Sequence, residues 1–179
     1  QEAFVTWQNT VSDHFLISNG TKQGGLLSPY LFTRYIRKLL YSISISQLGC
    51  RIGGLAINIL AYADDIVLLA PSWIAMQELL VILEYCCKMF DLTCNAKKTV
   101  CMKFDPKDRN KIVSSQFQEF TLCGNTLQFV SEFRYLGHII NDKLRDDSDI
   151  EREIRNMYIR TNILIRRFSR CSTVVKLRL

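Results

Sequence analysis

Several features that would assign this sequence to a well-known class are missing from it. No apolar run reaches the roughly 18–20 residues that a membrane-spanning helix needs, so we expect no transmembrane segment and no membrane partner. No signal-peptide pattern follows the first residue, which is Gln1 rather than Met. The sequence also lacks internal repeats and low-complexity tracts. We therefore expect an internal piece of a longer protein that is intracellular, in the nucleus and/or the cytoplasm.

Cysteine and histidine lack the spacing of a zinc site or a disulfide framework. The seven cysteines are an odd number, and none of them forms a C-x-x-C pair. Several lie in apolar surroundings, so we expect reduced thiols packed in a core. The two histidines, His14 and His138, lie far apart in the sequence and are assigned no role. The cysteines are Cys50, Cys86, Cys87, Cys94, Cys101, Cys123 and Cys171.

Positive charge is concentrated at one end of the chain, whose net charge is +6. Residues 1–151 contain fifteen Lys and Arg against sixteen Asp and Glu. Residues 152–179 contain eight basic residues and a single acidic one, Glu153. A nearly neutral body with a basic end suggests a polyanionic partner at that end, although a solvated helix face would have the same composition.

Apolar periodicity predicts an α+β fold. One helix is expected with Ser28 as its N-cap, Pro29 at its first position and Gly49 past its end. A second is expected from about Ser72 to Leu92. Short strands precede, separate and follow the two helices. Two helices packed on one face of an antiparallel sheet form an α+β layer fold.

The later part of the chain contains further strand and helix signals. Gly124 and Asn125 are the expected two-residue turn of a hairpin. The stretch FRYLGHII at residues 133–140 predicts a strand whose pattern is broken by its glycine. The last helix is expected to begin with a capping box that runs from Ser148 to Glu151.

Two adjacent carboxylates, Asp64 and Asp65, lie in the otherwise apolar stretch LAYADDIVLLA at residues 60–70. The flanking residues predict two central strands joined by a tight turn at the aspartates. Such a turn would hold both carboxylates rigidly, and one or two carboxylates with substrate phosphates are the usual ligands of Mg²⁺. Taken alone, the pair is equally consistent with an ordinary polar hairpin tip.

Three further segments accompany the aspartate pair. GTKQGG at residues 20–25 leads directly into the first predicted helix, where glycines allow close backbone approach and a helix N-terminus favours phosphate. NAKKT places Lys97 and Lys98 just before a predicted strand. FRYLGHII follows a predicted hairpin, and the basic helix comes after it.

These four segments, in this order, resemble the palm of a reverse transcriptase. GTKQGGLLSPYLF (20–32) resembles the Gln-Gly motif, AYADDIVLLA (61–70) the catalytic Asp-Asp hairpin, NAKKTVCMKF (95–104) the Asn-to-Lys motif and FRYLGHII (133–140) the primer grip. Ser-Pro at the helix start and Ala-Asp-Asp are more similar to a non-LTR (LINE-type) retrotransposon enzyme than to a retroviral one. Group II intron enzymes share Gln-Gly-Gly and Tyr-Ala-Asp-Asp and stay an alternative. Gly25 departs from the acidic or polar residue of many LINE-type enzymes.

The resemblance implies an architecture and an activity. Residues 1–145 would form a polymerase palm, with a ferredoxin- or RRM-like antiparallel sheet and two helices on one face. Residues 146–179 would begin a helical thumb. The implied reaction is RNA-directed DNA synthesis, in which two Mg²⁺ (or Mn²⁺) ions assist the transfer of dNTPs onto a DNA primer paired with an RNA template. The oligomeric state is left open.

The resemblance also assigns residues to roles. Asp64 would be the firm metal ligand and Asp65 a weaker or more distant one. Lys98 would contact the incoming triphosphate or protonate pyrophosphate, unless it is a solvated lysine at a strand end. The other implied residues are Gln23 and Gly24 near the template or pairing nucleotide, Tyr62 and Ala63 near the primer end, Phe133, Arg134, Tyr135, Leu136 and Gly137 in the primer grip, and Arg155, Arg160, Arg166 and Arg167 along the nucleic-acid backbone.

One part of the family's metal site has no match. The family needs a further aspartate on a strand that precedes the Gln-Gly motif. The only aspartate before Gly24 is Asp13, which lies in a predicted hairpin too close to that motif, and Glu2 has no matching context. We therefore expect this aspartate and the fingers to lie upstream, and we expect the chain to be inactive as an isolated polymerase.

Two other interpretations stay open. The chain can be the remnant of an element, binding nucleic acid or a protein partner without catalysis. An unrelated ferredoxin-like metal-binding domain would require the four motifs to coincide by chance.

Overall fold

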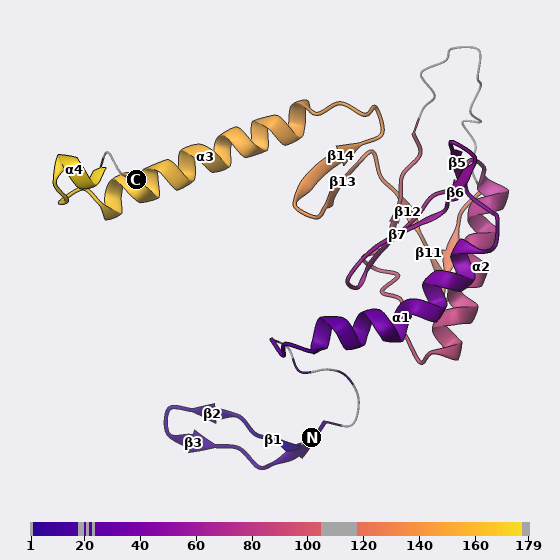
Figure 1. The fold of residues 1–179 in the computed structure, drawn as a ribbon, viewed down its shortest axis with the longest axis horizontal. Coiled ribbons are helices and arrows are strands. Elements are labelled where there is room, and N and C mark those ends of the chain that lie inside the picture. Colours follow the sequence, from indigo (N-terminus) through magenta and orange to yellow (C-terminus); the bar gives the residue numbers. More distant parts are fainter. Residues whose placement is uncertain (1, 18–19, 21, 23, 105–117, 177–179) are drawn as a thin grey trace. The chain divides into compact units, whose positions relative to one another are not determined.

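The computed structural model describes residues 2–17, 20, 22, 24–104 and 118–176 of the 179-residue chain (Figure 1). The chain divides into two compact units, Gln1–Cys94 and Asn95–Leu179. Each unit is described by itself below.

The described residues of the first unit form three hairpins and two long helices. The hairpin at the start of the chain consists of two ladders of two residue pairs each, β1–β4 and β2–β3. Two more hairpins follow the first helix and precede the second. The elements are β1 (Glu2–Ala3), β2 (Thr6–Trp7), β3 (Thr10–Val11), β4 (Phe15–Leu16), α1 (Ser28–Ser44), β5 (Cys50–Ile52), β6 (Leu55–Ile57), β7 (Ile59–Tyr62), β8 (Asp65–Leu68) and α2 (Trp73–Met89).

The second unit contains three small ladders and the basic helix. Its first ladder is parallel, pairing β12 with β9, and the other two are antiparallel hairpins. The second of these hairpins leads into the long helix α3 (Figure 1). The elements are β9 (Val100–Cys101), β10 (Thr121–Leu122), β11 (Asn125–Thr126), β12 (Gln128–Phe129), β13 (Glu132–Tyr135), β14 (His138–Asn141), α3 (Asp147–Arg167) and α4 (Thr173–Lys176).

The core of the first unit lies between α1 and α2, which pack side by side (Figure 1). Apolar residues that recur at helical spacing on each helix are buried there, as the sequence pattern predicts. The Tyr35 hydroxyl donates a hydrogen bond to the carbonyl of Phe90, just past the end of α2. The buried side chains are Ile36, Leu39 and Ile43 of α1 and Leu79, Leu80, Leu83, Cys86 and Cys87 of α2.

The second unit has a smaller core. Phe120, Leu122 and Leu127 are its buried apolar residues, and the rings of Phe120 and Phe129 lie 5.8 Å apart. None of the residues of α3, all of which the structure describes, is buried. The helix therefore contributes little to this core.

The mixed α and β content agrees with the predicted α+β class, but the predicted sheet is not observed. Among the described residues, the strands form seven separate two-stranded ladders. The prediction of two central strands at residues 57–70 is wrong for this structure, because β7 and β8 pair only with each other. Leu60 and Tyr62 on β7 are accordingly exposed. An apolar stretch indicates a strand but does not specify its neighbours.

Four predicted boundaries are wrong by a few residues. Helix α1 ends at Ser44 with Ile45 as its C-cap, so Gly49 does not end the helix as predicted. Helix α1 has Leu27 at its N-cap, because the Ser28 hydroxyl donates to the carbonyl of Lys22 and caps nothing. The turn between β10 and β11 consists of Cys123 and Gly124, both with positive φ. The predicted capping box is also absent, since α3 begins at residue 147, one residue before the predicted N-cap Ser148, which therefore lies inside the helix.

Helix α2 begins where the sequence predicts and ends at Met89, three residues before the predicted end at Leu92. Ser72 is its N-cap, and the Ser72 hydroxyl accepts a hydrogen bond from the backbone N–H of Ala75. In the part of the chain that the structure describes, no helix is both long enough and apolar enough to cross a membrane.

Candidate functional site

The aspartate pair lies at the tip of the β7–β8 hairpin. Tyr62 at the end of β7 pairs with Asp65 at the start of β8, which leaves Ala63 and Asp64 as the two turn residues. Both carboxylates are exposed. The prediction of a tight turn at the aspartates is therefore confirmed, with Asp64 in the turn and Asp65 in the ladder.

The turn at this tip differs from the other hairpin turns. Gly53–Gly54 and Leu136–Gly137 have positive φ at both central positions, as type I′ turns require. In the aspartate hairpin only Ala63 does, with φ of 52°. Asp64 thus has an ordinary backbone conformation, whereas Ala63 has the less favourable positive φ.

The base of the hairpin is held by a buried amide. Asn58, directly before β7, is 2% exposed. Its Nδ2 donates to the Ile43 carbonyl at 2.6 Å and to the Ser46 hydroxyl at 3.3 Å, and its backbone carbonyl accepts from the Leu69 N–H at 2.9 Å. Gly49, with φ of 121°, leaves room for it. The β7–β8 hairpin is thereby tied to the C-terminal end of α1.

The donor set at the tip fits part of a magnesium site. Asp64 and Asp65 provide carboxylate oxygens, the ligands that Mg²⁺ and Mn²⁺ prefer, and exposure leaves them accessible to substrate phosphates. Among the described residues, no group of three or more acidic, cysteine or histidine side chains is close enough to hold a metal ion by itself. The pair accordingly fits a site completed by other ligands.

The glycine loop before α1 is a tight turn. The Gly25 N–H donates to the Lys22 carbonyl at 3.0 Å, and Gly24 has φ of 76°. A Cβ at Gly25 would lie 2.7 Å from the Ser28 hydroxyl. A side chain at position 25 would therefore displace the Ser28 hydroxyl. Gln23, the predicted template contact, lies outside the described residues.

Lys98 lies in a turn that is shaped by Asn95. The Lys98 N–H lies 3.0 Å from the Asn95 carbonyl and 3.2 Å from its Oδ1, and the Thr99 hydroxyl donates to the same carbonyl at 2.9 Å. Lys97 and Lys98 are both exposed. The turn precedes β9 in the second unit, as the sequence predicts.

The predicted primer-grip segment is a hairpin rather than one strand. Its strands β13 and β14 pair over four residues each, and Leu136 and Gly137 form the turn with φ of 48° and 91°. Phe133, Arg134 and Leu136 are exposed, whereas Tyr135 is half-buried. The glycine that breaks the strand pattern is the second residue of the turn.

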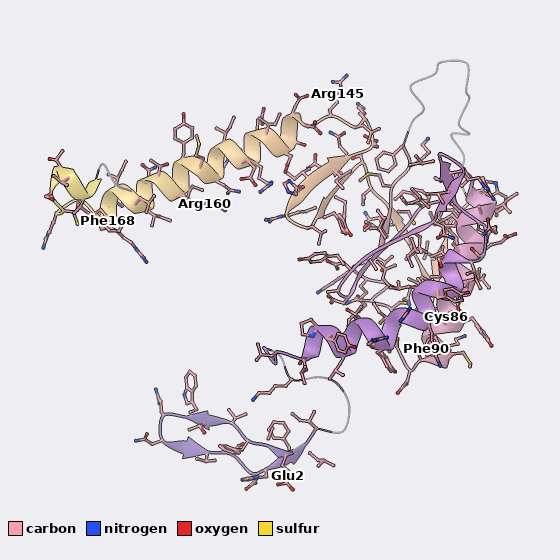
Figure 2. All side chains as sticks on the ribbon, in the orientation of Figure 1. Glu2, Cys86, Phe90, Arg145, Arg160 and Phe168 are labelled. Atoms are coloured by element: carbon pink, nitrogen blue, oxygen red, sulfur yellow. The ribbon has the colours of Figure 1, made fainter. Side chains whose placement is uncertain are left out.

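The four predicted backbone-contacting arginines are all exposed on α3: Arg155, Arg160, Arg166 and Arg167. Figure 2 shows side chains extending from every side of this helix, with Arg160 near its middle.

Residues 2–140 match the family model described as reverse transcriptase (RNA-dependent DNA polymerase). The chain belongs to the reverse transcriptase family. Two curated relatives are similar in sequence. The retrovirus-related Pol polyprotein from type-2 retrotransposable element R2DM of Drosophila melanogaster is 33% identical over 129 residues, which are 70% of this chain and 12% of the relative. The corresponding polyprotein from type-1 retrotransposable element R2 of Popillia japonica is 32% identical over 127 residues, which are 68% of this chain and 18% of the relative.

These matches confirm the predicted kinship with non-LTR retrotransposon reverse transcriptases. The matched region includes the glycine loop, the aspartate hairpin, the Lys98 turn and the β13–β14 hairpin. The chain spans less than a fifth of the length of either relative.

Of the predicted site residues, the structure brings together Tyr62, Ala63, Asp64 and Asp65 on one turn. Lys98, the β13–β14 hairpin and the arginines of α3 belong to the second unit. Two further residues with many hydrogen bonds were not predicted as site residues. Asn58 could have been noticed in the sequence, because it is a polar residue that interrupts an otherwise apolar stretch. For Asp149 the sequence offered only the local pair with Arg152 three residues on, because its partners on β14, His138 and Ile139, are ten or eleven residues away.

Proposed function

We propose that this chain is the palm portion of an RNA-directed DNA polymerase from a non-LTR retrotransposon. The observation that carries the proposal is the β7–β8 hairpin, which presents Asp64 and Asp65 on a turn whose base is fixed by a buried amide. Residues 1–145 would be palm, with a ferredoxin-like sheet completed in the longer protein, and residues 146–179 would begin the thumb. The protein would act in the nucleus and/or the cytoplasm.

Asp64 and Asp65 would hold divalent metal, with Asp64 the firmer ligand. When bound, Mg²⁺ or Mn²⁺ stabilises the attacking primer oxygen and the leaving pyrophosphate. The chain's own contribution is geometric. Asn58 ties the hairpin to α1, so that the carboxylates are held in place before substrate binds.

Other exposed residues would bind the remaining substrates. Tyr62 and Ala63 would lie beneath the primer end, and Gly24 with Gln23 would contact the template or the pairing nucleotide. Lys98 would contact the dNTP triphosphate, supported by its exposure and by the turn that Asn95 shapes.

The second unit would hold the primer and the duplex. Phe133, Arg134, Tyr135, Leu136 and Gly137 would position the primer strand. Arg155, Arg160, Arg166 and Arg167 would contact backbone phosphates in a salt-dependent manner without reading sequence. Their exposure on a helix with no buried residue supports this role.

We further propose that residues 1–179 alone do not polymerise. Two carboxylates at the tip are fewer than a two-metal site requires, and no further acidic side chain joins them among the described residues. Primer extension on an RNA template with Mg²⁺ or Mn²⁺ tests this. Robust synthesis by the isolated chain would refute it.

The activity itself is tested in the longer reading frame. We expect Asp64→Ala to abolish synthesis while template binding is kept, because only metal binding is lost. Asp13→Ala, which removes another exposed carboxylate, is the matched control and should leave synthesis unchanged. Equal activity in the two variants would remove Asp64 from the metal site.

A non-catalytic nucleic-acid-binding function is the second candidate, and the exposed arginines of α3 favour it. If this second function is correct, the longer protein binds the duplex but makes no DNA, with either Asp or Ala at position 64.

A further inference from the structure

Asp149, in the first turn of α3, accepts hydrogen bonds from two elements at once. Its Oδ1 accepts from the backbone N–H of Ile139 at 2.8 Å and from Arg152 Nε and Nη2 at 2.9 and 2.7 Å. Its Oδ2 lies 2.9 Å from His138 Nδ1, which donates when that nitrogen carries a proton. His138 and Ile139 belong to β14, so this single carboxylate joins the hairpin to the helix.

The carboxylate is well shielded for a charged group. The Asp149 side chain is 19% exposed and that of Arg152 is 16% exposed, whereas His138 is 69% exposed. The hydrogen bonds from His138, from the Ile139 N–H and from Arg152 hold the pKa of Asp149 well below its usual range. Arg152 also pairs with Glu153 at 2.7 Å. Asp149 is therefore ionised at every physiological pH.

Asp149 is hydrogen-bonded to β14, the strand that pairs directly with β13 and its primer-grip residues. In the ladder, His138 pairs with Tyr135 and Ile139 pairs with Arg134. The carboxylate thus fixes β14 one strand away from the residues assigned to the primer. On its other side it fixes the helix that carries the exposed arginines.

A helix dipole alone does not account for this arrangement. Asp147 lies in the same first turn and has the same favourable charge, but it is exposed and makes no hydrogen bond to a described residue. Asp149 differs from it in its hydrogen-bond partners and in the burial that comes with them. The two aspartates are consequently a matched pair for experiment.

We propose that Asp149 is a positioning residue, which fixes the first turn of α3 to the β13–β14 hairpin so that the primer-grip residues and the arginines of α3 bind one primer–template duplex as a single rigid surface. This rests on the proposed function, because it requires that the second unit binds such a duplex. Asp149 itself touches no substrate in this scheme.

The experiment compares Asp149→Asn with Asp147→Asn in binding a short RNA–DNA primer–template duplex at constant ionic strength. Either substitution removes one negative charge, which by itself favours binding of a polyanion. We expect Asp147→Asn to bind as tightly as the unaltered chain or slightly more tightly. We expect Asp149→Asn to bind about three- to tenfold more weakly, the size of effect seen for residues that act through others.

Two further measurements separate positioning from a general loss of structure. Hydrogen exchange at the Ile139 amide should become faster in Asp149→Asn, while amides in β9 to β12 keep their rates. Asp149→Glu, which keeps the charge and the acceptor, should recover part of the affinity. If Asp149→Asn does not fold, His138→Ala replaces it, because that exposed side chain provides only one of the links; a two- to threefold loss is expected.

The outcomes distinguish the two proposals. If the unaltered chain binds the duplex and both asparagine variants bind equally well, the positioning role is wrong and the proposed function stands. If the unaltered chain does not bind the duplex at all, the proposed function of the second unit fails and the positioning role fails with it.

Discussion

Two hairpins of the same size are held in different ways. The β7–β8 hairpin carries the aspartate pair and is tied at its base by the neutral, buried amide of Asn58. The β13–β14 hairpin carries the primer-grip residues and is tied along one strand by the ionised carboxylate of Asp149. The hydrogen bonds of Asn58 depend on burial and are independent of pH. The hydrogen bonds of Asp149 depend on its charge, so acid and competing ions weaken them.

The largest effect is expected from Asn58→Asp. In its ionised form the new carboxylate cannot donate to the Ile43 carbonyl and places an unpaired charge in the core. We expect a loss of about 3 kcal/mol or more in the free energy of unfolding, measured by chemical denaturation. Asn9→Asp, at an exposed turn, is the control and should change little. Equal losses in the two variants would show that burial of Asn58 does not matter.

A smaller loss is expected from Gly49→Ala. A Cβ at this position would overlap the side chain and backbone of Asn58, and its φ of 121° disfavours any other residue. We expect a loss of about 2 kcal/mol. Gly53→Ala is the matched control, since Gly53 also has positive φ but no atom lies within 4 Å of its would-be Cβ. The difference in unfolding free energy between the two variants measures the cost of the contact with Asn58. Equal losses would show that this contact costs nothing.

The ionic tie predicts a pH dependence that the amide tie lacks. The pKa of Asp149 is depressed in the folded state, so its stabilisation is complete above its ordinary value of 3.8 and is lost as the pH falls below that value. His138, Arg152 and Glu153 are the charged or titratable groups around it. Thermal unfolding of the unaltered chain and of Asp149→Asn should differ most near pH 7 and converge towards pH 2. A difference that stays constant across this range would contradict the prediction.

The smallest effect is expected next to Asp149. The Ser148 hydroxyl is buried and has no hydrogen-bond partner among the described residues. Ser148→Ala removes this unsatisfied group and improves helix propensity in the first turn. We expect a gain of about 0.5 kcal/mol in unfolding free energy. A loss instead would mean that the hydroxyl finds a partner in solution.

Local patterns in the sequence were sufficient for much of the molecule. Helical spacing of apolar residues predicted α1 and α2, because on each helix the buried side chains recur every three or four residues. The tight turn at Asp64 and Asp65 also followed from neighbouring residues alone. The order of four short motifs was enough to predict the reverse transcriptase family, which the match over residues 2–140 confirms.

Tertiary structure decided what holds those elements in place. Asn58 bonds to a carbonyl 15 residues away, and Asp149 bonds to a ring 11 residues away, so no local period reveals either contact. A contact outside the local pattern also explains why Ser28 is not the predicted N-cap of α1. Its hydroxyl donates to the carbonyl of Lys22 instead of accepting from the helix. A periodic pattern specifies which residues share a face. Which donor meets which acceptor depends on how the faces are brought together, and only the folded chain determines that.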